Sequence, residues 1–466
     1  MKNVILSLLY LVIVSCNNQE LVKKNTEHEV WHKNATIYEV NLRQFTEEGT
    51  FKAFLPHIER IHDLGIDILW FMPVHPIGVI NRKGVLGSYY SVKDYRGINP
   101  EFGTKEDFVA IIEKAHSLDM KVLMDLVANH TAFDHDWAEQ HKEWYTLDSS
   151  GNFQPPIGTD WWDVADLNYD NVEMRLAMVD AMKYWVEDFD IDGFRCDAAS
   201  WLPVDFWSQA ITSLNKLKPV FMLAEAENPA LHEIGFDMTY AWEYLHVTNE
   251  IAKGNMYFED LDKLMIKEDS VYNEDAYRLY FTTNHDENSW NGTVFERYGN
   301  KHLLQAILAF TIDGMPLLYS GQEAGLNKRL KFFEKDAIKW GDYIYADFYS
   351  ALLKLHQKHP ALWNGKYGGT FEKMDYEDDD LYCYQRVKED NMVFVFLNFS
   401  IDSGCDRVDR FDYIDKRLIS PICHDRFDCK VQKHHLLKNV PFSCFETQFE
   451  EVLVNFQGFP IEGILL

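Results

Sequence analysis

The stretch I-D-G-F-R-C-D-A-A-S, residues 191–200, places an arginine and an aspartate two positions apart at the end of an apolar run. Successive side chains of a β-strand alternate between its two faces, so Arg195 and Asp197 are expected to point to the same side. Gly193 and the small residues after Asp197 suit a strand that ends abruptly and continues as a loop. A cation beside Asp197 would keep it ionised as a nucleophile, although such a pair can also be a purely structural ion pair.

Three further stretches carry acidic or histidine residues at the ends of apolar runs. They read D-L-V-A-N-H at 125–130, M-L-A-E-A-E at 222–227 and F-T-T-N-H-D-E-N at 281–288. In these blocks, in their order and in their approximate spacing, the chain resembles the α-amylase family of glycoside hydrolases. The resemblance extends from about residue 35 to about residue 340.

Short apolar runs alternate with amphipathic segments up to about residue 357, the pattern of parallel strands joined by helices. Strands are expected at residues 35–40, 66–71, 121–126, 193–197, 220–224, 236–238, 278–282 and 315–320. Helices are expected at residues 51–64, 105–118, 172–186 and 301–310. The predicted fold is α/β, a (β/α)8 TIM barrel with a short insertion after the third strand and a C-terminal antiparallel β-domain.

The expected domain organisation has four parts. Residues 1–16 are expected to be a lipoprotein signal segment and residues 17–30 a flexible tether. The catalytic barrel is expected at 31–360, including an insertion at 131–168, and the β-domain at 361–466. Reactive groups of such a barrel lie at the carboxyl ends of its strands, where Asp197, Glu225 and Asp286 fall.

The resemblance to the family implies a role for each of these acids. Asp197 matches the nucleophile and Glu225 the acid/base, whose pKa must lie near the working pH. Asp286 matches the third acid, which holds sugar hydroxyls and stabilises the transition state. A retaining mechanism requires the first two carboxyl groups to be about 5–5.5 Å apart.

The resemblance also implies substrate-binding residues. The residue that matches Tyr90 stacks on the sugar whose bond is broken, and His130 and His285 match two histidines that hydrogen-bond the same sugar. Arg195 is expected to hold Asp197. Each of these side chains has a plain alternative as a structural group, and it is their joint occurrence at strand ends that favours an active site.

Calcium is a possible additional ligand, although the expected chemistry requires no cofactor. Family members often bind Ca²⁺ between the insertion and the barrel, and the resemblance offers Asn129 and Asp166 as candidate oxygen ligands. The family's frequent Lys-His pair after the nucleophile is replaced here by Ser200 and Trp201. The metal site is therefore left open.

Composition restricts the class of ligand. A formal net charge of -29 argues against nucleic acid, because phosphate binding needs clustered Lys and Arg. Aromatic residues make up 15% of the chain and could stack on sugars, although most are expected in the core. The expected partner is an α-glucan or a malto-oligosaccharide. The oligomeric state cannot be read from the sequence.

The first sixteen residues, M-K-N-V-I-L-S-L-L-Y-L-V-I-V-S-C, combine a basic start with an apolar segment too short to span a bilayer. They resemble a bacterial lipoprotein signal with lipidation at Cys16, and an ordinary secretory signal is the alternative. We therefore expect an exported, membrane-anchored protein on the periplasmic or cell-surface side. Cys196 is expected to be buried in the barrel, and the pairing of the five later cysteines is not readable.

Three functions are compatible with these residues. The leading hypothesis is a retaining α-glycoside hydrolase that cleaves α-glucosidic bonds in starch-like glucans or malto-oligosaccharides. An α-glucan transglycosylase of the same family would differ in using a sugar rather than water as acceptor. A non-catalytic glucan-binding protein would be indicated by a missing acid, and all three acids are present.

Overall fold

The computed structural model describes residues 30–374 and 380–399. Within these residues eight parallel strands close into a barrel in the order β1-β10-β9-β8-β7-β6-β3-β2. Their bounds are β1 Ile37–Val40, β2 Ile68–Phe71, β3 Lys121–Leu126, β6 Gly193–Cys196, β7 Phe221–Ala224, β8 Met238–Tyr240, β9 Tyr277–Tyr280 and β10 Met315–Tyr319. The predicted (β/α)8 TIM barrel is confirmed.

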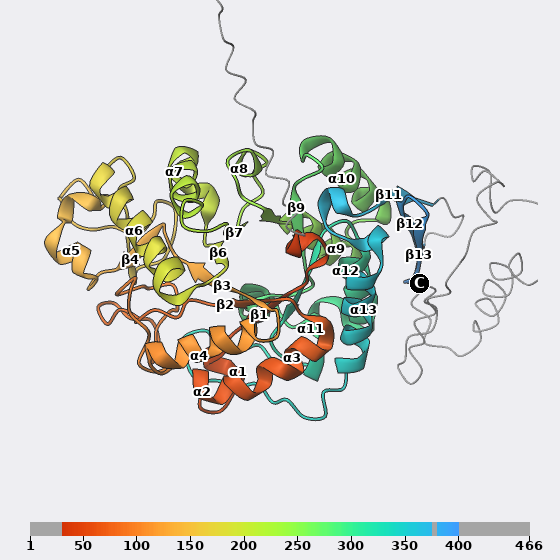
Figure 1. Cartoon of the computed structure of the whole chain (residues 1–466), viewed down its shortest axis with the longest axis horizontal. Helices are drawn as coiled ribbons and strands as arrows, with labels where there is room; N and C mark the ends of the chain where they lie inside the picture. The colour runs from red at the N-terminus through yellow and green to blue at the C-terminus, as the bar shows by residue number, and fades with distance from the viewer. Residues whose placement is uncertain (1–29, 375–379, 400–466) are drawn as a thin grey trace, which may run out of the picture. The chain divides into compact units, whose positions relative to one another are not determined.

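Helices surround the strands (Figure 1). They are α1 Leu42–Phe45, α2 Phe51–Phe54, α3 Ile58–Gly65, α4 Lys105–His116, α5 Asp136–Gln140, α6 Val172–Phe189, α7 Val204–Leu214, α8 Ala230–Glu233, α9 Trp242–Ala252, α10 Phe258–Val271, α11 Val294–Tyr298, α12 His302–Thr311 and α13 Ala346–Lys358. Local chemistry explains several ends. Thr104 and Asp107 form a capping box that starts α4, and Asp190 ends α6 in the left-handed conformation.

Some predicted element bounds are wrong. The expected helix at 51–64 is divided into α2, a 3-10 turn at Leu55–His57 and α3, because Pro56 has no N–H to continue the first helix. The sixth strand lies two residues later than predicted, at Met238–Tyr240. The seventh strand ends at Tyr280, so Asp286 lies beyond the strand end, at the cap of the helical turn Glu287–Asn291.

Alternation along the strands separates the barrel interior from the layer beneath the helices. Ile68 and Trp70 belong to the apolar cluster inside the barrel, whereas Leu69 and Phe71 pack with the helices. On β6 the same alternation turns Arg195 inward and buries Cys196 against the helix layer, as a free thiol. A side chain at residue 193 would lie 1.9 Å from the carbonyl oxygen of Phe221, so only glycine fits there.

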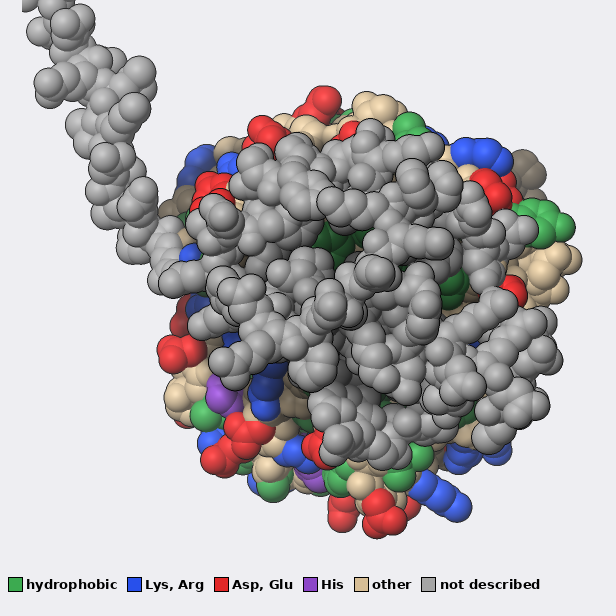
Figure 2. Space-filling view, turned by 90° about the vertical axis from the view of Figure 1, so that its right-hand side faces the viewer, with side chains coloured by type: hydrophobic (Ala, Val, Ile, Leu, Met, Phe, Trp, Pro, Cys, Tyr) green, Lys and Arg blue, Asp and Glu red, His purple; other side chains and the backbone are tan. Residues whose placement is uncertain are grey.

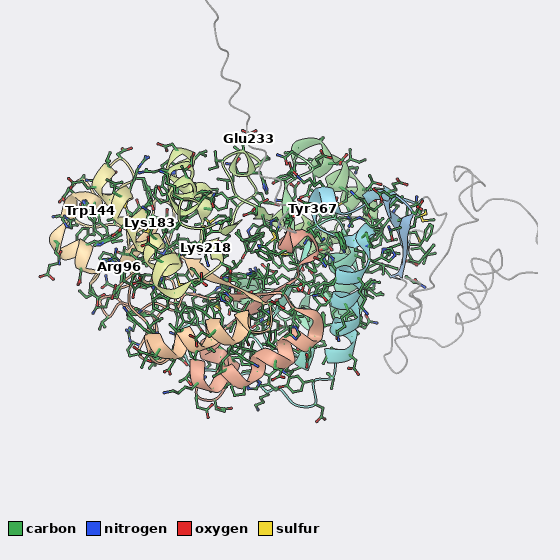
Figure 3. The ribbon with its side chains drawn as sticks, in the orientation of Figure 1. Arg96, Trp144, Lys183, Lys218, Glu233 and Tyr367 are labelled. Atoms are coloured by element: carbon green, nitrogen blue, oxygen red, sulfur yellow. The ribbon has the colours of Figure 1, made fainter. Side chains whose placement is uncertain are left out.

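The insertion after β3 is a small unit with its own core. Strands β4 His130–Ala132 and β5 Val164–Asp166 pair in antiparallel fashion, and α5 lies between them in sequence. Trp144, labelled in Figure 3, stacks on His141 at a ring separation of 4.0 Å and meets Trp137 edge-on. The chain enters and leaves this unit beside the carboxyl end of the barrel, so the insertion can supply a wall to a site there.

After the barrel the described residues form a three-stranded antiparallel sheet, the C-terminal β-domain that the sequence predicts. Its strands are β11 Thr370–Lys373, β12 Leu381–Lys388 and β13 Asn391–Asn398. Arg386 joins the sheet to the barrel through an ion pair of 2.8 Å with Asp313. The predicted signal segment, almost all of the tether and residues 400–466 of the β-domain lie outside the described residues, and the domain boundaries stay predictions.

Acidic and basic side chains both appear on the described surface visible in Figure 2. Elsewhere on the described surface, Lys218 pairs with Asp190 and Arg175 pairs with Asp205. In the part of the chain that the structure describes, no helix combines the length and apolar character needed to cross a bilayer.

Candidate active site

A cavity of about 570 Å³ opens at the carboxyl ends of the barrel strands. Six of the seven residues expected in catalysis or substrate binding line it: Tyr90, His130, Asp197, Glu225, His285 and Asp286. The seventh, Arg195, is fully buried behind this lining. The structure therefore brings together residues that lie up to about two hundred positions apart in the sequence.

Arg195 is the centre of the charged groups in the cavity floor. Its Nη1 atom donates to Asp197 Oδ1 at 3.0 Å and to both carboxylate oxygens of Asp125, at 3.0 and 3.2 Å. Its Nη2 atom lies 3.0 Å from Glu225 Oε1 at an angle that does not make a hydrogen bond, so this contact is electrostatic. One guanidinium thus faces three carboxyl groups and partly neutralises them.

The backbone immediately after Asp197 holds Glu225 in place. Ala198 has a φ of 45°, in the left-handed region that a residue with a side chain rarely adopts. In this conformation its N–H donates to Glu225 Oε2 at 2.8 Å. The strained turn therefore fixes the two carboxyl groups relative to each other.

The two carboxyl groups have raised pKa values. Burial raises the pKa of Glu225 to about 7 and that of Asp197 to about 6, although the charge of Arg195 opposes both shifts. The Glu225 side chain can therefore carry a proton near neutral pH while Asp197 is largely ionised. This is the combination that an acid beside a nucleophile requires.

His285 is held between two carboxyl groups. Its Nδ1 atom lies 2.5 Å from Glu39 Oε1, and its Nε2 atom lies 3.3 Å from Asp286 Oδ2. Burial alone would lower the pKa of His285, but the charges of Asp286 and Glu39 outweigh that effect and raise the pKa to about 9. The ring is therefore a cation at neutral pH, and both of its nitrogens are donors.

Tyr90 forms a flat wall of the cavity. Its ring stacks on His285 with a centroid separation of 5.4 Å and on Phe332 with a separation of 6.2 Å. Its hydroxyl group lies 2.7 Å from His285 Nε2 and donates to Asp125 Oδ2 at 3.0 Å. Trp290 continues the aromatic wall beyond Phe332.

His130 begins strand β4 of the insertion, and its ring is hydrogen-bonded to the backbone of Tyr90. Its Nδ1 atom is 3.3 Å from the amide nitrogen of Asn129, and its ring meets that of Trp161 at 5.4 Å. Burial lowers the pKa of His130 to about 4, so the ring is neutral. The cavity thus contains one charged and one neutral imidazole.

The candidate calcium ligands do not line the cavity. Asp166 pairs with His130 across β4 and β5, and the N–H of Leu167 donates to the carbonyl oxygen of Asn129. The two side chains offer one carboxylate and one amide oxygen, fewer than the six to eight oxygens that Ca²⁺ takes. Among residues 30–374 and 380–399 no group of three His, Cys, Asp or Glu side chains could hold a metal. Asn129 and Asp166 alone therefore do not fit a calcium site.

Two buried acids of the site were missed by the sequence analysis. Asp125 is the first residue of the block at 125–130 and is fully buried against Arg195, to which it is also paired in the β3–β6 register. Glu39 is a fully buried residue of β1 that contacts His285. Asp125 could have been found from the sequence, because the alternation of side chains that turns Arg195 inward on its strand also turns Asp125 inward on β3. For Glu39 the only signal is an acid in an otherwise apolar strand, I-Y-E-V.

The chain is similar to known proteins over most of its length. The family model described as alpha amylase, catalytic domain, matches residues 24–366. The crystal structure of an alpha-amylase from Lactobacillus plantarum superimposes with a TM-score of 0.73 at 31% identity, covering 79% of this chain and 89% of that one.

Two curated relatives show the range of activities in the same family. Alpha-amylase MalA of Haloarcula japonica is 28% identical over 388 residues, which cover 79% of this chain and 56% of the relative. A cyclomaltodextrin glucanotransferase of Bacillus licheniformis is 27% identical over 384 residues, 72% of this chain and 51% of the relative. The chain thus spans about half the length of these two proteins. With a closed barrel, paired carboxyl groups at its carboxyl end and a family match over most of its residues, the chain belongs to the alpha-amylase family of glycoside hydrolases.

Proposed function

We propose that this protein is a retaining α-glycoside hydrolase that cleaves α-glucosidic bonds in starch-like glucans or malto-oligosaccharides. The observation that supports this most directly is the contact of one guanidinium, that of Arg195, with both Asp197 and Glu225 at 3.0 Å. Two carboxyl groups spanned by a single guanidinium are compatible with the separation of about 5–5.5 Å in retaining enzymes.

In the first step Asp197 attacks the anomeric carbon and Glu225 gives its proton to the departing glycosidic oxygen. The bond between the anomeric carbon and that oxygen breaks, and a glycosyl ester forms on Asp197. Arg195 supports this step because it stabilises the ionised form of Asp197. The raised pKa of Glu225 keeps a proton available there near neutral pH.

In the second step a water molecule attacks the same carbon. Glu225, now ionised, takes a proton from the water, and the ester bond to Asp197 breaks. Two inversions restore the α configuration. Both reacting groups come from the chain, so this chemistry needs no cofactor.

The remaining residues bind the sugar at the point of cleavage. Asp286 is 35% exposed and faces the cavity, where it can accept hydrogen bonds from sugar hydroxyls. The charged His285 and the neutral His130 supply further hydrogen-bond partners. The ring of Tyr90 offers an apolar face for the sugar.

The transglycosylase alternative differs in what enters for the second step. If a sugar hydroxyl takes the place of water, the same residues transfer the glycosyl group instead of hydrolysing it. The similarity to the Bacillus licheniformis glucanotransferase keeps this alternative open. A non-catalytic binding protein is disfavoured because all three acids are present and face one cavity.

Product analysis after incubation with maltoheptaose, pullulan and cyclodextrins tests substrate and reaction together. Proton NMR in the first minutes reports the anomer that is released. We expect Asp197→Ala to lose several orders of magnitude in rate with near-normal binding, because the lost interaction is made chiefly in the transition state. Glu225→Gln should still be acylated by α-maltosyl fluoride, whose leaving group needs little protonation. Early release of the β anomer would show an inverting mechanism and overturn the role given to Asp197.

We also propose that the protein is exported and anchored to a membrane by lipid on Cys16. The support is the residues I-V-S-C at 13–16, after a short apolar segment. Cys16 lies outside the described residues. Cys16→Ser should abolish both the lipid mass increment and membrane fractionation, and an unchanged distribution between membrane and soluble fractions would refute the anchor.

A further inference from the structure

Two tryptophans from distant parts of the chain stack on each other at the rim of the cavity. Trp161 belongs to the insertion and lines the cavity, and Trp201 follows the nucleophile loop. Their ring centroids are 5.3 Å apart and their planes differ by 15°. Trp201 nevertheless keeps 51% of its surface exposed.

The backbone on both sides holds this stack in position. Trp201 ends the 3-10 turn Ala199–Trp201, in which its N–H donates to Ala198 O at 2.9 Å. The indole of Trp207 fixes the same turn by donating to Ala199 O at 2.9 Å. The rings therefore form a preorganised surface and need little ordering when a ligand binds.

The loop after Trp161 is tied down as well. Asp163 forms an ion pair of 3.1 Å with Lys83, and its carbonyl oxygen accepts from the hydroxyl of Ser91 at 2.9 Å. The N–H of Val164 closes the turn by donating to Trp161 O at 3.1 Å. The insertion thus presents Trp161 from a fixed loop.

The position of the stack relates it to one side of the bond that is cleaved. The N–H of Trp201 donates to Ala198 O at 2.9 Å, and the N–H of Ala198 donates to Glu225 Oε2 at 2.8 Å, so the backbone that carries Trp201 is two hydrogen bonds from Glu225. Asp286 caps the helical turn Glu287–Asn291, which carries Trp290, and the Trp290 ring contacts that of Phe332. An acid that protonates the departing oxygen must stand on the leaving-group side.

We propose that Trp161 and Trp201 form a platform for the sugar rings on the leaving-group side of the scissile bond. The proposal rests on the proposed function, because that function gives Glu225 its direction. Sugar rings have apolar C–H faces that pack on indole, and hydroxyl groups that need polar partners at the edge. Polar partners are near, since Lys83 contacts both Asp160 O, at 3.3 Å, and Asp163, at 3.1 Å, on the loop that carries Trp161, and all three residues line the cavity.

A stack that only clamped the insertion to the barrel would predict a different outcome on substitution. Loss of a sugar platform should lower kcat/KM only for substrates whose leaving group is a sugar chain. Loss of a structural clamp should lower kcat/KM for all substrates alike. Maltoheptaose and α-maltosyl fluoride separate these possibilities, because the leaving group of the fluoride is one atom.

We expect Trp201→Ala to lower kcat/KM for maltoheptaose about tenfold, because one apolar stacking surface is lost. The same substitution should lower kcat/KM for α-maltosyl fluoride much less. Trp201→Tyr should recover most of the loss. Trp162→Ala is the matched control, because Trp162 is 65% exposed on the same loop and is not one of the two stacked rings. This control should behave as wild type with both substrates, and thermal melting should report intact folding of every variant.

An equal loss with both substrates, or no loss with either, would overturn the platform. If the wild type cleaves neither substrate, the proposed function fails separately. Calorimetric titration of maltoheptaose into Asp197→Ala, with and without Trp201→Ala, then still decides the platform. In that case unchanged affinity would refute it, and about tenfold weaker binding would support it.

Discussion

Replacing Glu39 by glutamine tests whether this buried acid keeps His285 charged. The carboxylate of Glu39 is fully buried, contacts His285 Nδ1 at 2.5 Å, and leaves its second oxygen without a hydrogen-bond partner. Glutamine preserves the shape and can still accept from Nδ1, so the change removes charge more than contact. We expect the pKa of His285 to fall from about 9.

The size of the fall follows from the geometry. Two unit charges with centres about 4 Å apart attract by roughly 4 kcal/mol at an effective dielectric constant of ~20, which corresponds to about three pKa units. The pKa of His285 also depends on the charges of Asp286, Asp125 and Arg195, and the Tyr90 ring stacks on the imidazole. These four residues are unchanged in the variant. The His285 pKa should therefore fall to roughly 6 in Glu39→Gln.

The assay is the pH dependence of kcat/KM with α-maltosyl fluoride. With this substrate the loss of the Glu225 proton matters little, so the alkaline limb reports His285. A cation with a raised pKa is present below that pKa and is lost as the pH rises through it. The wild type should thus lose activity near pH 9, and the variant two or more units lower.

Glu323→Gln is the matched control for this prediction. Glu323 is also fully buried, but it binds Tyr38 and Arg60 and does not contact His285. The alkaline limb of the kcat/KM profile of Glu323→Gln should stay near that of the wild type. An alkaline limb in Glu39→Gln that remains near pH 9, in a protein that melts normally, would refute the role of Glu39.

Three further predictions concern the same site and its surroundings. With a natural glucan, activity should rise with pH through about 6 as Asp197 ionises and fall above about 7 as Glu225 loses its proton, and initial rates against pH check this. Asp125→Ala should destabilise the fold by about 3–5 kcal/mol in urea unfolding, because it removes a partner of the buried Arg195; a change under about 1 kcal/mol would contradict this. Treatment with EDTA should change activity and melting temperature little, because Asn129 and Asp166 alone offer fewer oxygens than Ca²⁺ takes, whereas complete and calcium-restorable loss would show that Asn129 and other oxygens bind Ca²⁺.

The sequence predicts the barrel well because its evidence is local. Alternating apolar runs locate the strands, and the i, i+2 rule places Arg195 and Asp197 on one face. It does not predict that Pro56 divides a helix. Nor does it say which interior side chains meet across the barrel, because that depends on the stagger between strands.

Glu39 and His285 illustrate this limit. They are 246 residues apart and come from β1 and from the loop after β9, which are not neighbours in the barrel. The Trp161–Trp201 stack is similar, since it joins an insertion to a turn. Contacts between such distant segments can be identified only from the three-dimensional structure of the closed barrel.

The charge balance around the cavity has a consequence for inhibitors. Five acidic side chains surround two cationic ones in the described site: Glu39, Asp125, Asp197, Glu225 and Asp286 against Arg195 and His285. Such a surplus of negative charge favours any ligand that carries a positive charge at the position of the anomeric carbon. Sugar mimics with a protonated ring nitrogen should therefore bind more tightly than their neutral oxygen counterparts, and their advantage should fade at a pH where that nitrogen loses its proton.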